Sequence, residues 1–159
     1  MQVTYTPIGV IRSPFQTPEG MPIQPAGAVG IEGAIDIFEP YEQGLADLEG
    51  FSHIILIYHF HKVNGWDLTV TPFLDTEPLG LFATRAPRRP NPVGLSVVRL
   101  LSREGRRLRI EGVDVLDGTP LIDIKPYSPE FDHAESARTG WMAKARGDVR
   151  GKKSDDRFA

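Results

Sequence analysis

Cysteine is absent from the 159-residue sequence, and that absence excludes disulfides, thiolate zinc sites and cysteine nucleophiles. It suits a reducing compartment, so we expect a cytoplasmic protein. No window holds about eighteen apolar residues in a row, so we expect no membrane span and no membrane partner. The opening MQVTYTPIGVIRSPF lacks a basic stretch ahead of an apolar one, so we expect no secretory signal peptide.

The common nucleotide-binding and hydrolase motifs are also missing. The sequence has no G-x-x-x-x-G-K-[ST] loop, no G-x-G-x-x-G after a strand and no G-x-S-x-G elbow. It has no RNP-like aromatic motif and no paired-cysteine zinc module. The sequence therefore lends no support to nucleoside triphosphate hydrolysis, dinucleotide chemistry or serine hydrolysis.

Long helical patterns are scarce, whereas alternation of apolar and polar residues, the pattern of a half-buried strand, recurs along the chain. The clearest examples are Ala34–Phe38, Leu108–Leu116 and Leu121–Lys125. The stretch His53–His61 is nearly continuous, like a strand buried on both faces. Further candidate strands read VTYTPIGVI, LTVTPFL, GLFATR and GLSVVRLL. Many short strands bounded by Gly, Pro or Asp favour a mainly β domain, a sandwich or a barrel, with short peripheral helices.

The chain has the length of a single domain, which we place at residues 1–132. Residues 133–159 form a basic tail, in which DHAESARTGWMAKAR predicts a short helix. We expect the polar, glycine-broken residues after it to be mobile. In the body of the chain, YEQGLADLEG has room for one short turn of helix. Trp141 in the tail either packs on its own domain or forms a contact with a second copy.

Charge is distributed unevenly. Residues 1–132 carry 11 Lys and Arg against 17 Asp and Glu, a balance of −6, and residues 133–159 carry 7 against 4, a balance of +3. Eight of the eleven bases in the body lie between Arg85 and Arg109. This basic segment fits either a polyanion site or a solvated strand face.

The most unusual stretch is TRAPRRPNPVGLS, residues 84–96, with three arginines and three prolines. Proline fixes its own φ and restricts the residue before it, so Arg89 and Asn91 have little backbone freedom. The stretch is either a plain surface loop or a stiffened site for an anion or a nucleotide.

Three further segments are candidates for ligand contact. DGTP, Asp117–Pro120, joins two alternating runs and predicts a hairpin turn at the rim of the domain. EGMPIQPAG, Glu19–Gly27, is a long, stiff loop of the kind that often binds ligands. FHK ends the most buried strand, where His59 and His61 share one face of it. The other two histidines supply no recognisable third ligand, so we expect no metal site.

Four motifs in one order give a resemblance to a known family. They are PIGVIRSPF, GLADLEGFSHIILIYHFHK, FATRAPRRPNPVGLSVVRLL and GVDVLDGTPLIDIKPYSP. From Thr6 to Asp132 the chain resembles the TsaA-like family, also called the TrmO-type tRNA (adenine-N6)-methyltransferases. The resemblance implies a single small β-barrel, a homodimer, and binding of S-adenosylmethionine without a Rossmann domain. It also implies methylation of N6 of threonylcarbamoyl-adenosine at position 37, just 3′ of the anticodon, with tRNA as the partner.

The family's cofactor contacts fall on residues that the motifs match one by one: Pro22, Ile23, Gln24, His61, Lys62, Arg85, Leu95, Asp117, Gly118, Thr119 and Pro120. Three features depart from the family pattern. Ile23 stands where an arginine is common, and Arg88 stands where a histidine is frequent. The larger bacterial members carry an additional C-terminal domain, and here a basic tail of under thirty residues follows the matched region.

The chemistry of methyl transfer assigns further roles. Attack by an acylated adenine nitrogen favours a general base, and the candidates by position are His59, His61 and Asp114, with Asp117 beside them. We expect Arg85 to meet the methionyl carboxylate of the cofactor. Substrate contacts are expected from Arg88, Arg89 and Asn91. Two alternatives stay open: methyl transfer to a small molecule or another RNA, and a cofactor-binding module without catalysis.

Overall fold

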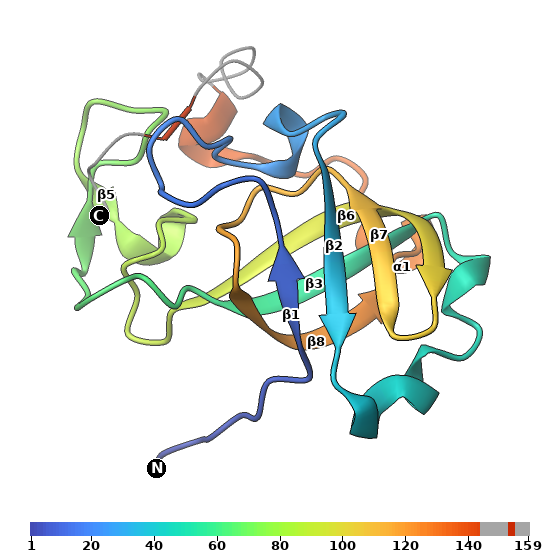
Figure 1. Ribbon diagram of the computed structural model, residues 1–159. Coiled ribbons are helices and arrows are strands. Elements are labelled where there is room, and N and C mark those ends of the chain that lie inside the picture. The colour runs from blue at the N-terminus through green and yellow to red at the C-terminus, as the bar shows by residue number, and fades with distance from the viewer. Residues whose placement is uncertain (144–152, 155–159) are drawn as a thin grey trace.

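The computed structural model describes residues 1–143 and 153–154. Six antiparallel strands close into a barrel (Figure 1). In their order around the barrel they are β1 (Gly9–Arg12), β2 (Glu32–Ile37), β7 (Arg107–Glu111), β6 (Val93–Glu104), β3 (His53–His59) and β8 (Thr119–Pro126). The mainly β fold and the small barrel expected from the sequence are confirmed.

Two short strands and several short helices lie outside the barrel. Strands β4 (Thr69–Val70) and β5 (Leu79–Gly80) form a separate two-stranded sheet. The helices are the single α-helical turn α1 (Pro129–Asp132) and five 3-10 helices: η1 (Pro25–Gly27), η2 (Glu39–Leu45), η3 (Leu48–Gly50), η4 (Leu81–Ala83) and η5 (Gly140–Ala143). In the described part of the chain, no helix is long and apolar enough to cross a membrane.

The barrel interior is the hydrophobic core. Because side chains alternate along a strand, every second residue of β3 and β6 points inward, and these positions are buried. The core is filled mostly by branched aliphatic side chains: Ile11, Ile35, Ile37, Leu45, Ile54, Leu56, Tyr58, Val98, Leu100, Leu108, Ile110, Val113, Val115 and Leu121. The expectation that β3 is buried on both faces was wrong, since the closed barrel leaves its outer face only half-buried.

Two strand predictions needed correction at glycines. Strand β7 ends at Glu111, short of Leu116, because Gly112 has φ +91°, which an extended strand does not tolerate. The DGTP segment is a turn with Gly118 at φ +77°, but it does not form a hairpin. Strand β8, which follows it, pairs with β1 and β3 instead of with β7.

The predicted helix over 132–146 is not formed in residues 133–143, where the only helical element is the short turn η5. Ser136 and Gly140 have φ +57° and +55°, which interrupt a right-handed helix. The end of that predicted helix, residues 144–146, and most of the segment 147–159 expected to be mobile lie outside the described residues. The GLFATR segment forms η4 after the two residues of β5, where a longer strand was expected.

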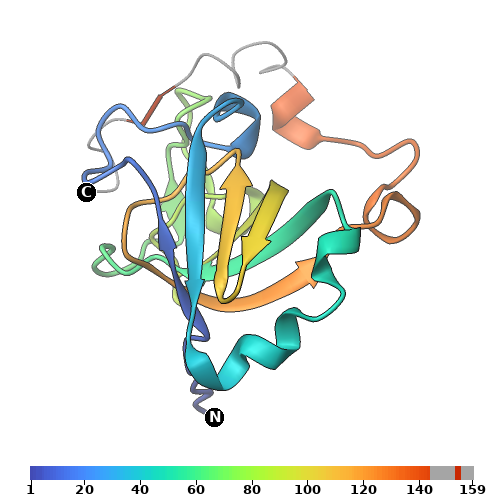
Figure 2. The same ribbon diagram turned by 45° about the vertical axis from the view of Figure 1, so that its right-hand side comes forward.

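The connections gather at one end of the barrel. In Figures 1 and 2 the loop after β1, the long β3–β6 connection and the described C-terminal residues lie at the same end, away from the N-terminus. These are the segments that the sequence singled out as stiff or unusual, and they enclose the cavity described next.

Candidate functional site

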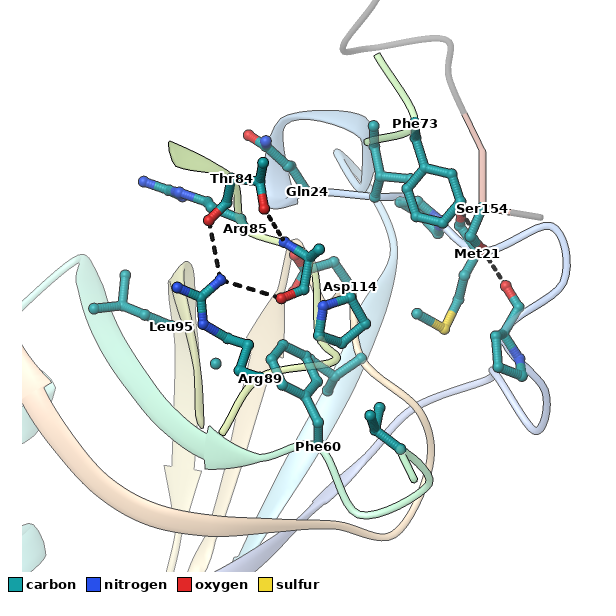
Figure 3. A pocket seen from close by; sticks show the side chains of 18 of the residues that line it. Met21, Gln24, Phe60, Phe73, Thr84, Arg85, Arg89, Leu95, Asp114 and Ser154 are labelled. Atoms are coloured by element: carbon teal, nitrogen blue, oxygen red, sulfur yellow. Dashed lines mark hydrogen bonds between the residues drawn. The ribbon is translucent and has the colours of Figure 1, made fainter. Parts of the chain in front are cut away.

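A cavity of about 440 Å³ opens at this end of the barrel. That volume falls in the range of small-molecule sites. The segments that line it are distant in sequence. They are the β1–β2 loop (18 and 21–24), Tyr58 of β3, the β3–β6 connection (60–63, 72–74, 84–87 and 89), the start of β6, the β7–β8 connection, Thr119 of β8, and the C-terminal residues Trp141, Met142 and Ser154. In the view of Figure 3, Met21, Phe73 and Ser154 lie on one side of the cavity, across from Leu95.

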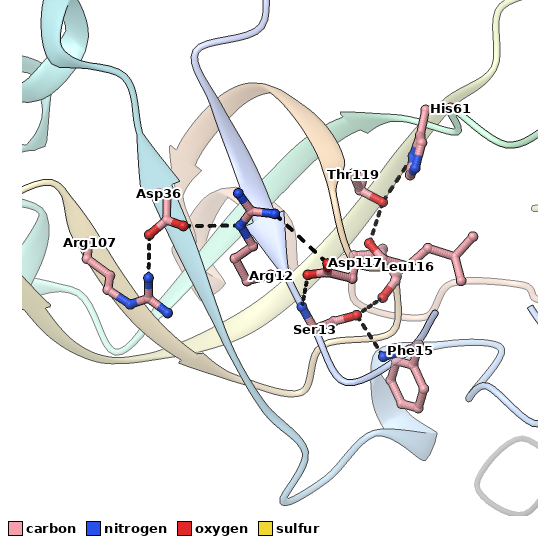
Figure 4. Close-up of polar contacts among 10 residues, drawn as sticks. Arg12, Ser13, Phe15, Asp36, His61, Arg107, Leu116, Asp117 and Thr119 are labelled. Atoms are coloured by element: carbon pink, nitrogen blue, oxygen red, sulfur yellow. Dashed lines mark hydrogen bonds and ion pairs between the residues drawn. The ribbon is translucent and has the colours of Figure 1, made fainter. Parts of the chain in front are cut away.

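The structure brings most of the predicted cofactor residues together. Eight of them line the cavity: Pro22, Ile23, Gln24, His61, Lys62, Arg85, Leu95 and Thr119. The other three, Asp117, Gly118 and Pro120, are not among its lining residues. Asp117 instead fixes the turn to β1: its Oδ1 accepts the Ser13 amide at 3.2 Å, and its Oδ2 lies 3.9 Å from the Arg12 guanidinium (Figure 4).

The candidate general bases separate in space. His61 and Asp114 line the cavity, whereas the exposed His59 and the turn residue Asp117 are not among its lining residues. The expectation that His59 and His61 share a strand face was wrong, because β3 ends at His59. A turn follows, closed by the Val63 amide donating to the Phe60 carbonyl at 3.3 Å, and it redirects His61 into the cavity.

The arginines of the stiff loop have three different environments. Arg85 lines the cavity, where its charge acts on Asp114 without a hydrogen bond or ion pair to any described residue. Arg89 also lines it, but its Nη1 donates to the carbonyls of Thr84 and Ala86 at 3.0 and 3.2 Å (Figure 3). Arg88 lies outside the lining and pairs with Asp67 at 3.2 Å.

The predicted substrate residue Asn91 is exposed and also lies outside the lining. Its carbonyl accepts the Val93 amide at 2.8 Å, which helps to set the start of β6.

The remaining arginines of the basic segment lie on β6, on β7 or in the turn between these strands, and each has an acidic neighbour. The pairs are Arg99–Glu111, Arg103–Glu49, Arg106–Glu42, Arg107–Asp36 and Arg109–Glu32, with N–O distances from 2.7 to 3.9 Å. These charges are therefore largely balanced on the outer surface. Of the two interpretations of the segment, the solvated strand face describes this part, whereas Arg85 and Arg89 lie at the cavity without an acidic partner in an ion pair among the described residues.

Asp114 has the most perturbed carboxyl group of the cavity. Burial among protein atoms raises its pKa from 3.8 to about 6, against the opposing effects of a hydrogen bond from Ser96 and of the Arg85 charge. Some of its surface stays accessible because the residue lines the cavity. Ser96 Oγ donates to Asp114 Oδ1 at 2.7 Å, and Tyr58 OH lies 3.0 Å from the same hydroxyl.

His61 is the second titratable group of interest. Partial burial, then the electrostatic effects of Lys62 and His59, lower the pKa of its imidazole, which favours the neutral ring. Its Nδ1 lies 3.5 Å from Thr119 Oγ1, which donates to the Leu116 carbonyl at 2.7 Å (Figure 4).

Several lining residues were not predicted from the sequence. Trp141 Nε1 donates to the Ala83 carbonyl at 2.8 Å, so this indole packs on its own chain. Ser154 lies antiparallel to the β1–β2 loop. Its amide donates to the Met21 carbonyl at 2.8 Å, and its carbonyl accepts the Gly20 amide at 3.1 Å. Nothing in the polar sequence around Ser154 indicates this pairing. Among the described residues, no group of three or more His, Cys, Asp or Glu is placed to hold a metal ion.

Comparison with known proteins settles the family. The model of the tRNA-methyltransferase O N-terminal domain matches residues 10–133. The chain belongs to the TrmO N-terminal domain family. A probable S-adenosyl-L-methionine-binding protein of Pyrococcus abyssi is 52% identical over 158 residues, which cover 99% of this chain and 86% of the relative. The tRNA (adenine(37)-N6)-methyltransferase of Escherichia coli is 36% identical over 148 residues, covering 87% of this chain and 63% of the enzyme.

Solved structures agree with this assignment to the TrmO family. A crystal structure of TrmO superposes with a TM-score of 0.77 at 43% identity, covering 88% of this chain and 64% of that one. The TrmO of Pseudomonas aeruginosa gives 0.75 at 40% identity, covering 89% and 63%. The chain therefore spans less than two thirds of the length of these TrmO proteins and of the Escherichia coli enzyme, but most of the length of the Pyrococcus relative.

Proposed function

We propose that this TrmO-family chain is an S-adenosylmethionine-dependent methyltransferase that methylates N6 of threonylcarbamoyl-adenosine at position 37 of tRNA. One observation carries the proposal: eight of the eleven positions matched to the family's cofactor contacts, from five separate segments, line one cavity. The names of the relatives support both the cofactor and the base position. We further propose that the protein works in the cytoplasm, where its tRNA would be found.

The cavity offers the environments that S-adenosylmethionine needs. Leu95 and Leu116 supply apolar surface for the adenine ring, and Arg85 supplies an unpaired guanidinium for the methionyl carboxylate. The sulfonium requires oxygen atoms or ring faces near it, which Asp114 and Phe60 provide in the same lining. The protein's main task is to align sulfur, methyl carbon and acceptor nitrogen and to exclude water.

The acceptor would approach from the side of the stiff arginine loop. Arg89 is held by two carbonyls of that loop and stacks its guanidinium over the Phe82 ring, 5.8 Å from the ring centroid. This anchoring lowers the ordering cost when an anion binds. We therefore propose that Arg89, together with Arg88 and the exposed Asn91 of the same loop, meets the phosphates or the threonyl carboxylate of the tRNA.

We also propose a homodimer. Ile57 pairs with Leu95, and Ile55 with Val97, in the register of β3 and β6, so all four side chains share the outer face of the barrel. Leu95 is 50% exposed and lines the cavity, which makes the apolar strip continuous with the site. A second copy seated on this strip would shield it from water. Light scattering on a size-exclusion column should give twice the chain mass, and Val97→Glu should give the monomer mass.

The test of the activity uses the methyl group as a tracer. Purified protein and labelled S-adenosylmethionine are incubated with bulk tRNA, with tRNA from cells that lack the threonylcarbamoyl group, and with a small-molecule extract. The proposal expects label in the first tRNA pool alone. Label in both tRNA pools would refute the modified acceptor, and label only in small molecules would refute tRNA as the substrate. Binding of cofactor without transfer to any fraction would leave a binding module.

The role of the arginine loop has its own measurement. Arg89→Ala should weaken tRNA binding and reduce the slope of log affinity against log salt by about 1, since one phosphate contact is lost. Arg107→Ala removes a base whose charge is already balanced by Asp36 at 2.7 Å, and it serves as the matched control. An unchanged salt slope in Arg89→Ala would show that Arg89 does not meet a phosphate.

A further inference from the structure

A row of three hydroxyl and carboxyl groups runs from the barrel core to the cavity. Tyr58 is on β3, Ser96 is on β6, and Asp114 is in the β7–β8 connection, so three separate segments contribute one residue each. Tyr58 OH and Ser96 Oγ are 3.0 Å apart, and Ser96 Oγ and Asp114 Oδ1 are 2.7 Å apart. Tyr58 and Ser96 are almost fully buried, at 4% and 2% exposure.

The hydrogens in this row have one arrangement at neutral pH. A serine hydroxyl has a single hydrogen, and Ser96 donates it to Asp114. Tyr58 must then donate its own hydrogen to Ser96. Burial and the nearby Asp114 charge raise the pKa of the Tyr58 phenol well above its usual value, so it keeps that hydrogen. The row therefore points two O–H bonds, one behind the other, toward the Asp114 carboxylate.

Packing fixes the position of the Tyr58 ring. Its partner in the β3–β6 register is Gly94, and a Cβ built on Gly94 would lie 2.3 Å from a ring carbon of Tyr58. The ring of Phe60 packs edge-on against Tyr58, with centroids 5.4 Å apart and an 86° angle between planes. Gly94 thus leaves the space that the Tyr58 ring occupies, and Ser96, two residues later on β6, forms the hydrogen bond to its hydroxyl.

Asp114 has the surroundings of a usable base. It lines the cavity, and the charged or titratable groups around it are Arg85 from the arginine loop and Tyr58 from β3, with His61, Lys62 and Arg89 elsewhere in the same lining. Its pKa of about 6 leaves it ionised at pH 7 to 8, yet more basic than an ordinary carboxylate. His59, by contrast, lies outside the cavity.

We propose that Asp114 is the general base of the methyl transfer, and that Ser96 and Tyr58 are positioning residues that aim its carboxylate at the acceptor nitrogen. This inference rests on the proposed function. As the C–N bond forms, the C–S bond breaks and its electron pair returns to sulfur, giving the neutral thioether. The proton of the acceptor N–H passes to the Asp114 carboxylate and later to water. No other reactant is required.

The pH dependence of single-turnover methylation tests the assignment. In the unaltered protein, the rate should fall about tenfold per pH unit below pH 6, because Asp114 becomes protonated. Asp114→Asn should lose roughly 100-fold or more at every pH. Ser96→Ala removes a hydrogen bond that favours the charged carboxylate, so its profile should move to higher pH, with a loss of roughly tenfold at pH 6 that falls below about twofold at pH 8.5.

Ser102→Ala is the matched control on the same strand. Ser102 Oγ is buried and has no hydrogen-bond partner among the described residues, so its removal should leave the profile unchanged. Ser96→Thr keeps the hydroxyl and should keep the midpoint of the unaltered protein. A Ser96→Ala profile that is lowered uniformly, without a shift in midpoint, would refute the positioning role. An Asp114→Asn protein that keeps more than about a tenth of the rate would refute the general base.

A readout without activity separates this inference from the proposed function. Carbon-13 NMR of the aspartate carboxyls should find one group that titrates near pH 6, that disappears in Asp114→Asn, and that titrates at higher pH in Ser96→Ala. If these shifts are seen but no acceptor gains a methyl group, the hydrogen-bonded row is correct and the proposed activity is wrong. If methyl transfer proceeds and no aspartate titrates near pH 6, the assignment of Asp114 as the general base, positioned by Ser96 and Tyr58, is wrong.

Discussion

Gly94→Ala is the substitution whose cost the structure defines most closely. The added Cβ would lie 2.3 and 2.5 Å from two ring carbons of Tyr58 and 2.8 Å from a ring carbon of Phe60. Both rings would have to move, and Tyr58 cannot do so without breaking its hydrogen bond to Ser96. Overpacking of a tight core costs about 1–3 kcal/mol, and a lost hydrogen bond adds about 0.5–1.5 kcal/mol. We therefore expect the free energy of unfolding to fall by roughly 2–4 kcal/mol.

Urea unfolding followed by circular dichroism measures this loss as a lower midpoint at an unchanged slope. Gly44→Ala is the control, since nothing lies within 4 Å of its Cβ position, and it should change stability by less than about 1 kcal/mol. The cause is tested in a Tyr58→Leu background, where the ring carbons are gone. If Gly94→Ala costs the same in both backgrounds, the clash with Tyr58 is not the reason that position 94 is glycine.

Three further predictions concern the cofactor, the buried acid and the C-terminal strand pairing. Arg85→Ala should weaken S-adenosylmethionine binding roughly 10- to 150-fold in calorimetric titration, the worth of a hydrogen bond to a charged group, while Arg109→Ala, a base outside the cavity, should leave the affinity unchanged. The folded pKa of Asp114 lies above its ordinary 3.8, so the free energy of unfolding should fall as the pH rises from about 4 to 6. Asp114→Asn should remove that fall, which is worth up to about 3 kcal/mol at pH 7. Identical pH profiles of unfolding in the two proteins would contradict this. A chain ended after residue 152 loses the Ser154 carbonyl that accepts the Gly20 amide, so hydrogen exchange at Gly20 should accelerate at least tenfold, and equal exchange would show that the pairing does not persist in solution.

The sequence predicted the elements that depend on local pattern. Alternating runs such as Ala34–Phe38 and Leu121–Lys125 became barrel strands, because a period of two buries one face of any strand against a closed interior. The proline-stiffened loop and the family motifs also located most of the cavity lining, including Arg85 and Leu95. Local chemistry and the order of the motifs sufficed there.

What depends on long-range pairing was not predicted. DGTP has the composition of a hairpin turn, but β8 finds its partners in β1 and β3, and no local signal distinguishes that pairing from a hairpin. The surroundings of Asp114 likewise come from Ser96 and Tyr58, on strands distant in sequence. His59 and His61 looked equivalent, and only the end of β3 between them places one in the cavity and leaves the other outside it.

A crystal structure with S-adenosylmethionine bound is the most direct test of the central claim, that one cavity at the end of the barrel holds the methyl donor. We expect density for the whole cofactor between the β1–β2 loop and β6, with the adenine ring on Leu95, the carboxylate on Arg85 and the methyl carbon facing the side of Asp114. Cofactor density anywhere else on the barrel, with this cavity empty at a saturating concentration, would contradict the account.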